Sequence, residues 1–355
     1  MGRDPADRTT VTAANQRRRS PSIRDVAREA GVSRQTVSRV INNHPSLRPE
    51  TRDRVLQVIE QMRYRPNAVA RALGRNSSHV IGVLALQRTQ YGPIAAIQAI
   101  EEAAVAYGFV SFTVPLTDTS SDMIREGLEF LVSQQVAGIV VIAPQRPVLK
   151  EVTQLELDIP YVLLHSRVDD ETDLEIFADQ RHGARLAVAH LADQGHRRIA
   201  HLAGPADWME AEARLHGYRD ELTARGLDPL PVVHGDWSSA SGAALADPIV
   251  ASGATAVFCS NDQMALGLIH AVRLRNLSVP EDVSVVGFDD IPEAAYFAPP
   301  LTTVRQDFAS MGRRCVARLI TPPPGAPMAA TRLDITPAST VALVVRESVR
   351  NITSR

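Results

Sequence analysis

Residues 23–42 read IRDVAREAGVSRQTVSRVIN, and this stretch decides how the amino-terminal part of the chain folds. Apolar residues recur at helical spacing on both sides of Gly31, a natural helix terminator. Small Ala27 permits a close helix crossing, and Val32 and Val37 are placed to hold the two helices together. The pattern therefore predicts a helix-turn-helix, a motif that binds DNA.

Capping residues mark where the helices of this region begin. Ser22 and Asp25 have the spacing of a capping box, and Ser33 is placed to cap a second helix. Pro49 opens a third apolar helical pattern, and proline is favoured at a first helical position. We therefore expect residues 21–66 to form a three-helix headpiece.

The second helix would leave polar side chains facing outward at its N-terminal end. Such side chains reach phosphates or base edges, where arginine suits guanine and glutamine suits adenine. An ordinary helical hairpin with a polar face is the alternative. The residues of this segment that we expect to contact DNA are Ser33, Arg34, Gln35, Thr36, Ser38, Arg39 and Asn42.

The charge of the chain is unevenly distributed. Residues 1–79 carry 16 arginines against 7 acidic residues, whereas the remainder carries 22 basic and 33 acidic residues, within a formal net charge of -2. A basic segment on an acidic body suggests that the segment meets a polyanion, although a merely solvated basic arm is the alternative. Residues 1–20 are polar and aperiodic, and we expect a disordered leader there.

From residue 80 onward, short apolar runs alternate with amphipathic helical stretches. This alternation predicts an α/β core of two doubly wound parallel-sheet subdomains with a ligand cleft between them. Every apolar run is far shorter than the ~20 residues that a membrane helix needs, so no membrane partner is expected. The predicted strands are IGVLAL (81–86), VSFTV (110–114), AGIVVIA (137–143), PYVLLH (160–165), RIAHLAG (198–204), AVFCS (256–260) and VSVVGF (283–288).

Several classes of site have no support in the sequence. The two cysteines form no CxxC pair, and the basic run Arg17–Arg19 is not followed by an apolar signal segment, so we expect a cytoplasmic protein. Phosphate-binding glycine loops, nucleophile elbows and HExxH zinc motifs are absent from the sequence. We therefore expect no enzymatic activity, no cofactor and no metal, and we expect His196 to close a helix-to-strand turn.

The stretch DVAREAGVSRQTVSRVIN, followed by RPNAVARALG, resembles the headpiece and hinge of the LacI family of bacterial repressors. Later stretches resemble the core of that family: GHRRIAHLAGP, EARLHGY, VFCSNDQMALG, VPEDVSVVGFDD and PPLTTVRQD. The resemblance implies a periplasmic-binding-protein-like core at 80–355. It also implies a hinge at 67–79 that becomes helical on operator DNA and places Leu73 in the minor groove, with Asn67, Val69 and Ala70 at neighbouring hinge positions.

The resemblance further implies that a small effector binds between the core subdomains. Arg214, Asn261 and Asp289 match ligand-binding positions, and together they complement vicinal hydroxyls, although singly each is more often a surface or cap residue. Trp237 in GDWS matches a position that stacks on sugar rings in the galactoside-responsive branch, with plain core packing as the alternative. Further effector candidates are Tyr91, Asp179, Trp208, Gln306 and Phe308.

These features together predict a homodimeric transcriptional repressor that binds a pseudo-palindromic operator. A sugar, of galactoside-inducer type, is expected to change its operator affinity. A corepressor-dependent or activating regulator of the same family is the first alternative. A sugar-binding transport protein is the second, but such a protein has no reason to carry the headpiece.

Overall fold

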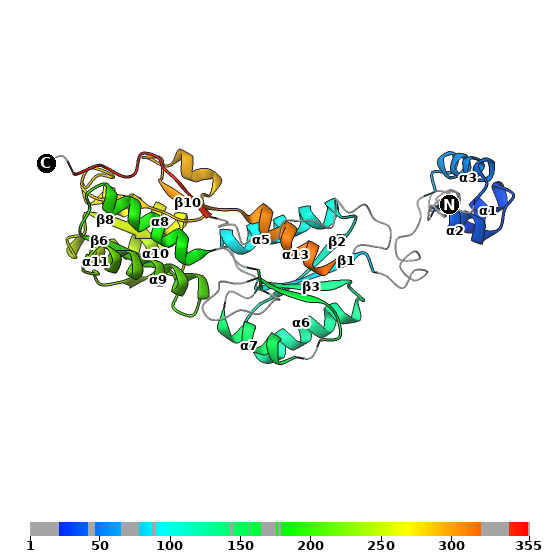
Figure 1. The fold of residues 1–355 in the computed structure, drawn as a ribbon, viewed down its shortest axis with the longest axis horizontal. Helices are drawn as coiled ribbons and strands as arrows, with labels where there is room; N and C mark the ends of the chain where they lie inside the picture. Colours follow the sequence, from blue (N-terminus) through cyan, green and yellow to red (C-terminus); the bar gives the residue numbers. More distant parts are fainter. Residues whose placement is uncertain are drawn as a thin grey trace, which may run out of the picture. The chain divides into compact units, whose positions relative to one another are not determined.

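The chain divides into two compact units, residues 1–77 and residues 78–355 (Figure 1). Both units have a hydrophobic core of their own among the described residues. The computed structural model describes residues 21–41, 47–64, 78–86, 90–142, 145–155, 157–164, 175–176, 179–320 and 341–353.

The described part of the first unit consists of three helices, which are α1 (Ile23–Glu29), α2 (Arg34–Ile41) and α3 (Pro49–Gln61). The backbone N–H and the hydroxyl of Ser22 donate to Asp25 Oδ2 at 2.9 and 2.6 Å, which confirms the predicted capping box. Gly31 adopts a φ of 65° between α1 and α2, a conformation that glycine reaches without steric cost. Arg48 gives α3 no side-chain cap, yet the helix begins at Pro49 as predicted.

One valine from each helix closes the core of this unit. Val26, Val37 and Val55 are all completely buried. Ala27 lies beside them, and its small side chain lets α1 and α2 cross closely. The helix-turn-helix prediction is therefore confirmed.

The first lobe of the second unit, the N-lobe, is built on a five-stranded parallel sheet of order β2-β1-β3-β4-β5. Successive residues of β1 pack on opposite faces, with Val83 in one core cluster and Leu84 in another. A strand buried on both faces reads as a continuous apolar run, which is why the sequence revealed it. The strands are β1 (Val80–Leu86), β2 (Val110–Leu116), β3 (Gly138–Ile142), β4 (Tyr161–Leu164) and β5 (Glu175–Ile176).

Helices cover both faces of this sheet (Figure 1). One pair, α5 and α13, packs on the face that carries Val83, and the other pair, α6 and α7, packs on the face that carries Leu84. The helices are α5 (Tyr91–Ala106), α6 (Ser121–Ser133), α7 (Arg146–Gln154) and α13 (Phe308–Leu319).

The second lobe, the C-lobe, has a four-stranded parallel sheet of order β7-β6-β8-β9. One face packs against α8 and α9, and the other packs against α11 and α12, with α10 beside α12. The elements are α8 (Gln180–Asp193), β6 (Ile199–Ala203), α9 (Met209–Ala224), β7 (Val233–His234), α10 (Ser239–Ala244), α11 (Ala246–Ala251), β8 (Ala256–Cys259), α12 (Asp262–Leu274), β9 (Ser284–Val286) and the 3₁₀ helix η1 (Pro292–Tyr296).

A further pair of strands, β10 (Thr303–Gln306) and β11 (Val341–Val344), is antiparallel. The apolar runs did not predict this pair or the two-residue strands β5 and β7, because all four strands are at most four residues long and only β11 is wholly apolar. The two-lobed α/β prediction itself is confirmed, with this antiparallel pair added to the parallel sheets. No helix among the described residues is both long and apolar enough to cross a membrane.

Two histidines of the C-lobe are held in place by contacts with neighbouring residues. His196 lies between α8 and β6, where its ring nitrogens are 3.0 Å from Thr255 Oγ1 and 3.1 Å from the Arg350 carbonyl oxygen, as expected for a turn-closing residue. His201 on β6 is completely buried and stacks between the rings of Tyr218 and Phe258. Burial lowers the pKa of His201 to about 3, because the buried imidazolium would lose its hydration.

Acidification should therefore destabilise the core through His201. The unfolded chain binds a proton at this side chain near pH 6.5 but the folded chain binds it only near pH 3, so its contribution to stability falls as the pH drops below about 6.5. Between pH 7 and pH 5 the loss is on the order of 2 kcal/mol. We expect His201→Gln, which does not titrate, to lose this part of the pH dependence in urea unfolding.

Exposed His270 on α12 supplies the control. The variant His270→Gln should keep the wild-type pH dependence, and tryptophan fluorescence follows unfolding in all three proteins because both tryptophans lie in the C-lobe core. If the free energy of unfolding of His201→Gln fell with pH as steeply as that of the wild type, His201 would not be the source of this pH dependence.

Candidate functional site

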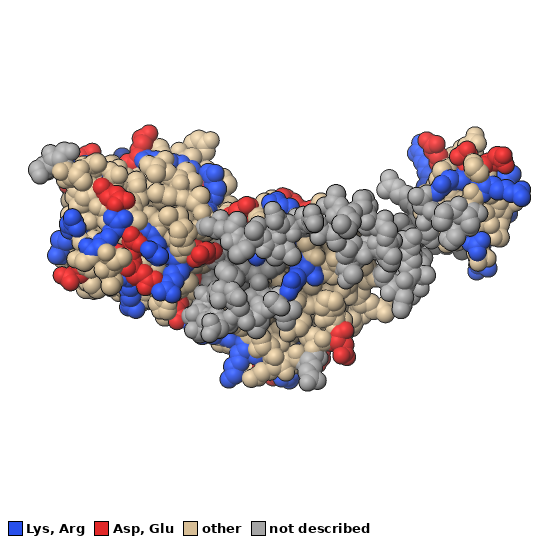
Figure 2. Space-filling view, viewed as in Figure 1, with Lys and Arg blue, Asp and Glu red and all other residues tan. Residues whose placement is uncertain are grey.

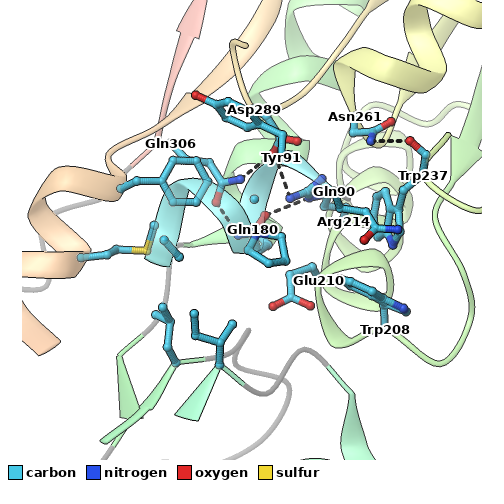
Figure 3. Close-up of a pocket in the computed structure, with 17 residues that line it drawn as sticks. Gln90, Tyr91, Gln180, Trp208, Glu210, Arg214, Trp237, Asn261, Asp289 and Gln306 are labelled. Atoms are coloured by element: carbon cyan, nitrogen blue, oxygen red, sulfur yellow. Dashed lines mark hydrogen bonds and ion pairs between the residues drawn. The ribbon is translucent and has the colours of Figure 1, made fainter. Parts of the chain in front are cut away.

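A cavity lies between the two lobes of the second unit (Figure 3). Its empty volume is about 660 Å³, part of it open to solvent, which suits a small ligand. The N-lobe side consists of Gln90, Tyr91, Gly92, Pro93, Ala96, Ile142, Leu164, Phe308 and Met311. The C-lobe side consists of Gln180, Trp208, Glu210, Arg214, Trp237, Asn261, Asp289 and Gln306.

Four buried polar side chains form a closed ring of hydrogen bonds in this cavity, which we call the polar ring: Arg214, Gln180, Gln306 and Asp289 (Figure 3). Arg214 Nε donates to Gln180 Oε1 at 2.8 Å, and Gln180 Nε2 donates to Gln306 Oε1 at 2.7 Å. Gln306 Nε2 donates to Asp289 Oδ1 at 2.7 Å, and Arg214 Nη2 reaches the same oxygen at 3.4 Å. The two amides thus relay hydrogen bonds from a cation to an anion.

The guanidinium of Arg214 makes two further contacts outside the polar ring. Its Nη1 donates to the carbonyl oxygen of Ser260, and its guanidinium lies 3.8 Å from the centroid of the Phe288 ring. Burial lowers the pKa of Arg214, and the negative charges of Asp289 and Glu210 oppose this shift. An arginine nevertheless stays protonated in proteins, so the guanidinium of Arg214 keeps its positive charge.

Asp289 occupies a strained position after β9. Its φ of 104° lies in the left-handed region, which is costly for a residue with a Cβ and is often found at functional sites. Burial raises the pKa of Asp289 to about 6, against the opposing effects of Arg214 and the hydrogen bond from Gln306. The carboxylate is therefore mostly ionised at neutral pH and accepts both hydrogen bonds.

Asn261 and Trp237 support each other. Asn261 Oδ1 accepts from the backbone N–H of Met264 at 2.9 Å and so caps α12, while its Nδ2 donates to the Trp237 carbonyl oxygen at 2.9 Å. Trp237 has a φ of 74° and is 6% exposed. A Cβ at Gly204 would collide with its indole, so the glycine makes room for this side chain.

Aromatic side chains form walls on both sides of the cavity. Trp208 and Trp237 on the C-lobe meet at 68°, with ring centroids 5.5 Å apart. Tyr91 and Phe308 on the N-lobe meet at 78°, with centroids 5.9 Å apart. Both pairs are edge-to-face.

Trp237 Nε1, a donor, and Gln90 Oε1, an acceptor, are buried polar atoms of cavity-lining residues that lack a hydrogen-bond partner within the described part of the chain. Buried polar groups are nearly always paired, so such atoms point to a polar ligand or to water.

Polar contacts join the lobes beside the cavity. Gln145 Nε2 donates to Asp207 Oδ2 at 2.5 Å, and Arg146 forms an ion pair with Glu212 at 2.7 Å. Gln145 also forms an isolated antiparallel bridge with Trp208. The start of α7 is thereby fastened to the segment that leads into α9.

The cavity brings together most of the effector residues predicted from sequence. Tyr91, Trp208, Arg214, Trp237, Asn261, Asp289, Gln306 and Phe308 all line it. Asp179 does not; its side chain is exposed and caps α8 by accepting from the backbone N–H of His182 at 2.8 Å.

Sequence reasoning missed three polar residues of the cavity: Gln90, Gln180 and Glu210. Gln180 directly follows Asp179, so the prediction fell one residue short of the side chain that enters the polar ring. Glu210 follows Trp208 by two residues in the first turn of α9, where an acidic residue is usually explained by the helix dipole.

The headpiece places its predicted DNA-contacting residues on α2 or at its cap. Ser33 caps α2 by accepting from the backbone N–H of Thr36 at 3.0 Å, and the two hydroxyls lie 2.9 Å apart. Arg34, Gln35 and Arg39 are exposed, and arginines are prominent on the visible surface of this unit (Figure 2). Thr36 and Ser38 are half-buried. Asn42 and the predicted hinge residues Asn67, Val69, Ala70 and Leu73 lie outside the described residues.

Comparison with known proteins identifies both parts of the chain. Residues 22–67 match the bacterial regulatory proteins of the lacI family, and residues 188–349 match the periplasmic binding protein-like domain. The lactose operon repressor of Escherichia coli (strain K12) is 35% identical over 306 residues, which cover 84% of each chain. The chain belongs to the LacI family.

Other members of the family are about as similar. The transcriptional repressor PurR of Vibrio parahaemolyticus is 34% identical over 84% of this chain and 91% of its own length. PurR of Haemophilus influenzae is 34% identical over 93% of this chain and 99% of its own. A structure of the Lac repressor dimer bound to operator and the anti-inducer ONPF has a TM-score of 0.80 at 31% identity, covering 94% of this chain and 100% of that one.

These relatives are transcriptional repressors and not enzymes. The present LacI-family chain is accordingly a DNA-binding transcriptional repressor with a ligand-binding core. The headpiece carries the helix-turn-helix, and the core carries the cavity with its polar ring.

The Arg214–Asp289 pair gives a direct test of the polar ring. Arg214→Met removes the cation and leaves Asp289 buried without it, which should destabilise the core by roughly 3–5 kcal/mol. Adding Asp289→Asn should restore part of the loss, because the orphaned charge is then gone. Urea unfolding followed by tryptophan fluorescence measures the two single variants, Arg214→Met and Asp289→Asn, and the double variant. A double variant that loses the sum of the two single losses would show that the two groups do not interact.

Proposed function

We propose that this repressor binds a pseudo-palindromic operator as a homodimer and releases it when a small sugar of galactoside type occupies the cavity. The polar ring beside Trp237 carries the ligand part of the proposal. A guanidinium, two amides and a carboxylate offer both donors and acceptors, as the hydroxyls of a sugar require. The face of an indole suits the apolar face of a sugar ring.

A sugar and a purine are the two ligand classes to be compared. Several relatives are PurR repressors, so a purine that tightens DNA binding is the second candidate. The regulator called CelR, whose structure is a cellobiose complex, has a TM-score of 0.63 at 29% identity and is compatible with a sugar ligand.

The DNA contact is proposed for the exposed side chains of α2. Arg34, Gln35 and Arg39 project from the second helix of the helix-turn-helix, the position from which side chains reach the major groove. A homodimer would present two such helices to two half-sites, which makes the operator an inverted repeat.

Exposed apolar side chains on the N-lobe support the homodimer. Val110 and Phe112 on β2 are 57% and 42% exposed, and Phe130 on α6 is 46% exposed with its ring centroid 5.9 Å from that of Phe112. β2 is an edge strand of the sheet. A continuous apolar patch on a sheet edge is costly in water, and a second copy of the chain would cover it.

The switch requires only a modest energy. To lower operator occupancy about a hundredfold, the sugar must prefer the non-binding arrangement of the core by ~2.7 kcal/mol. A few hydrogen bonds formed in one arrangement and not in the other supply this difference.

Operator recognition is tested on a duplex that the full-length protein selects from a random pool. We expect the selected sequences to be inverted repeats. Arg34→Ala should lower affinity for such a duplex by roughly 1–3 kcal/mol and relax the preference at one base pair in each half-site. The control is Arg28→Ala, which also removes one positive charge but from a side chain paired with Asp25 at 2.7 Å. An equal, uniform loss in both variants would argue against base recognition by Arg34.

The effector class is tested on the same duplex by a gel shift. Methyl β-galactoside or lactose should weaken DNA binding, and hypoxanthine should have no effect. Trp237→Ala should lose the sugar response but retain DNA binding, because Trp237 lines the cavity. Tyr296→Ala serves as a control, since Tyr296 is 87% exposed and lies outside the cavity lining. Tighter DNA binding with hypoxanthine would replace the inducer proposal with the corepressor one.

A further inference from the structure

Trp237 Nε1 and Gln90 Oε1 offer a ligand hydrogen bonds that the folded chain itself leaves unmade. Both atoms are buried, and neither has a hydrogen-bond partner in the described part of the chain. Trp237 lines the cavity from the C-lobe and Gln90 lines it from the N-lobe (Figure 3). Since the first atom is a donor and the second an acceptor, the two place complementary requirements on one ligand.

The indole of Trp237 is fixed in orientation by its neighbours. Its six-membered ring lies against Gly204, where even a Cβ would collide with it. Trp208 packs edge-to-face with ring centroids 5.5 Å apart, and the guanidinium carbon of Arg214 lies 5.5 Å from the centroid of the Trp237 ring. The backbone is held as well, because the Trp237 carbonyl oxygen accepts from Asn261 Nδ2 at 2.9 Å. The indole N–H therefore keeps one direction, and its partner must come to it.

Gln90 occupies the N-cap position of α5, yet its side chain makes no capping hydrogen bond. Serine, threonine, aspartate and asparagine are preferred at this position, because their short side chains reach the backbone N–H groups of the first turn. The longer side chain of Gln90 lines the cavity instead. The chain thus begins α5 with a residue whose amide serves the cavity and not the helix.

The other polar groups of the cavity are already engaged with one another. Arg214 donates from three nitrogens, and the two glutamines of the polar ring donate in turn. Asn261 uses both atoms of its amide. A ligand that binds such a group exchanges one hydrogen bond for another, so the net gain is small. A ligand that meets a buried atom without a partner gains more, because it also removes the desolvation penalty of that atom.

From these observations we infer that Gln90 is a specificity-determining residue: the effector donates a hydroxyl hydrogen to Gln90 Oε1 and accepts a hydrogen bond from Trp237 Nε1. This inference rests on the proposed sugar response and deepens it. A hydroxyl both donates and accepts, so a sugar can serve both atoms with the one kind of group that it carries in number. The sugar then joins a donor on one lobe to an acceptor on the other.

The test is a double-mutant cycle between ligand and protein. Galactose and its 2-deoxy, 3-deoxy, 4-deoxy and 6-deoxy forms are titrated calorimetrically into the full-length wild-type protein, Gln90→Met and Trp237→Phe. In the wild type, at least one deoxy probe should bind about tenfold more weakly than galactose. Gln90→Met, which keeps the length of the side chain without its polar atoms, should bind galactose about tenfold more weakly but lose nothing further with that deoxy probe. Trp237→Phe, which keeps an aromatic ring without Nε1, should likewise no longer distinguish galactose from one of the deoxy probes.

The stability of Gln90→Met without ligand separates this role from a structural one. The substitution removes a buried acceptor that has no partner in the free protein, so the free energy of unfolding in urea should equal or exceed that of the wild type. A residue that held α5 in place would lower it when replaced. Gln90→Leu repeats both measurements and keeps the test decisive if the methionine form does not fold.

Gln98→Met is the matched control. Gln98 lies about two turns further along α5, is exposed, and donates from Nε2 to Glu102 at 3.0 Å. It is not part of the cavity lining. The affinity of this variant for each of the five probes should equal that of the wild type.

Two outcomes would overturn the inference. In the first, Gln90→Met binds galactose as tightly as the wild type does. In the second, every deoxy probe keeps its wild-type affinity ratio to galactose in both Gln90→Met and Trp237→Phe, which would mean that water alone meets these atoms. Galactose still binds the wild type in either case, so the sugar proposal stands. A wild-type protein that binds its selected duplex but none of the five probes would refute the galactoside proposal, and this inference with it.

Discussion

The ligand-binding core depends on keeping one positive charge buried between its lobes. Arg214 is 4% exposed, and a buried guanidinium is tolerated only when its charge is balanced and its donors are satisfied. Asp289 supplies the charge, while Gln180 and the Ser260 carbonyl supply acceptors. Gln306 then binds both the amide and the carboxylate, which closes the ring and fixes the orientation of every group in it.

The same requirement explains the strain around the cavity. Asp289 and Trp237 adopt positive φ angles of 104° and 74°, which neither residue prefers. The polar ring holds Asp289 in place, and the hydrogen bond from Asn261 to the Trp237 carbonyl holds the tryptophan. The site is thereby pre-formed, with its polar groups oriented before a ligand arrives, and this lowers the entropic cost of binding.

The sequence alone predicted the strands that are buried on both faces. It did not predict the strands that form only by pairing with a distant segment of the chain. The strands β1, β3, β6 and β8 are buried on both faces and appear as apolar runs. The pair β10–β11 joins segments far apart in the chain, and each strand has only four residues, too few to give a periodic signal. Short-range patterns cannot reveal such a pairing.

The residues of the candidate site were likewise predicted only in part. Five of its residues lie in stretches that resemble the family, and the structure places them around one cavity together with three further candidates. The five are Arg214, Trp237, Asn261, Asp289 and Gln306, and the three are Tyr91, Trp208 and Phe308. Asp179 was a further candidate, but a side chain at a helix start can either cap the helix or enter a site, and here it caps α8 while Gln180 beside it enters the cavity. Glu210 was not predicted, because an acidic residue in the first turn of a helix is usually explained by the helix dipole. Only the folded chain places it in the same cavity as Arg214 and Asp289.

The position of the polar ring has a mechanical consequence. Gln180 is the first residue of α8, where the chain has just crossed from the N-lobe, and Gln306 is the last residue of β10, just before the chain crosses back to α13. Their hydrogen bond therefore joins two of the segments through which the chain passes between the lobes. For a rotation of one lobe on the other about these segments, a small displacement of the two amides corresponds to a much larger displacement at the far ends of the lobes.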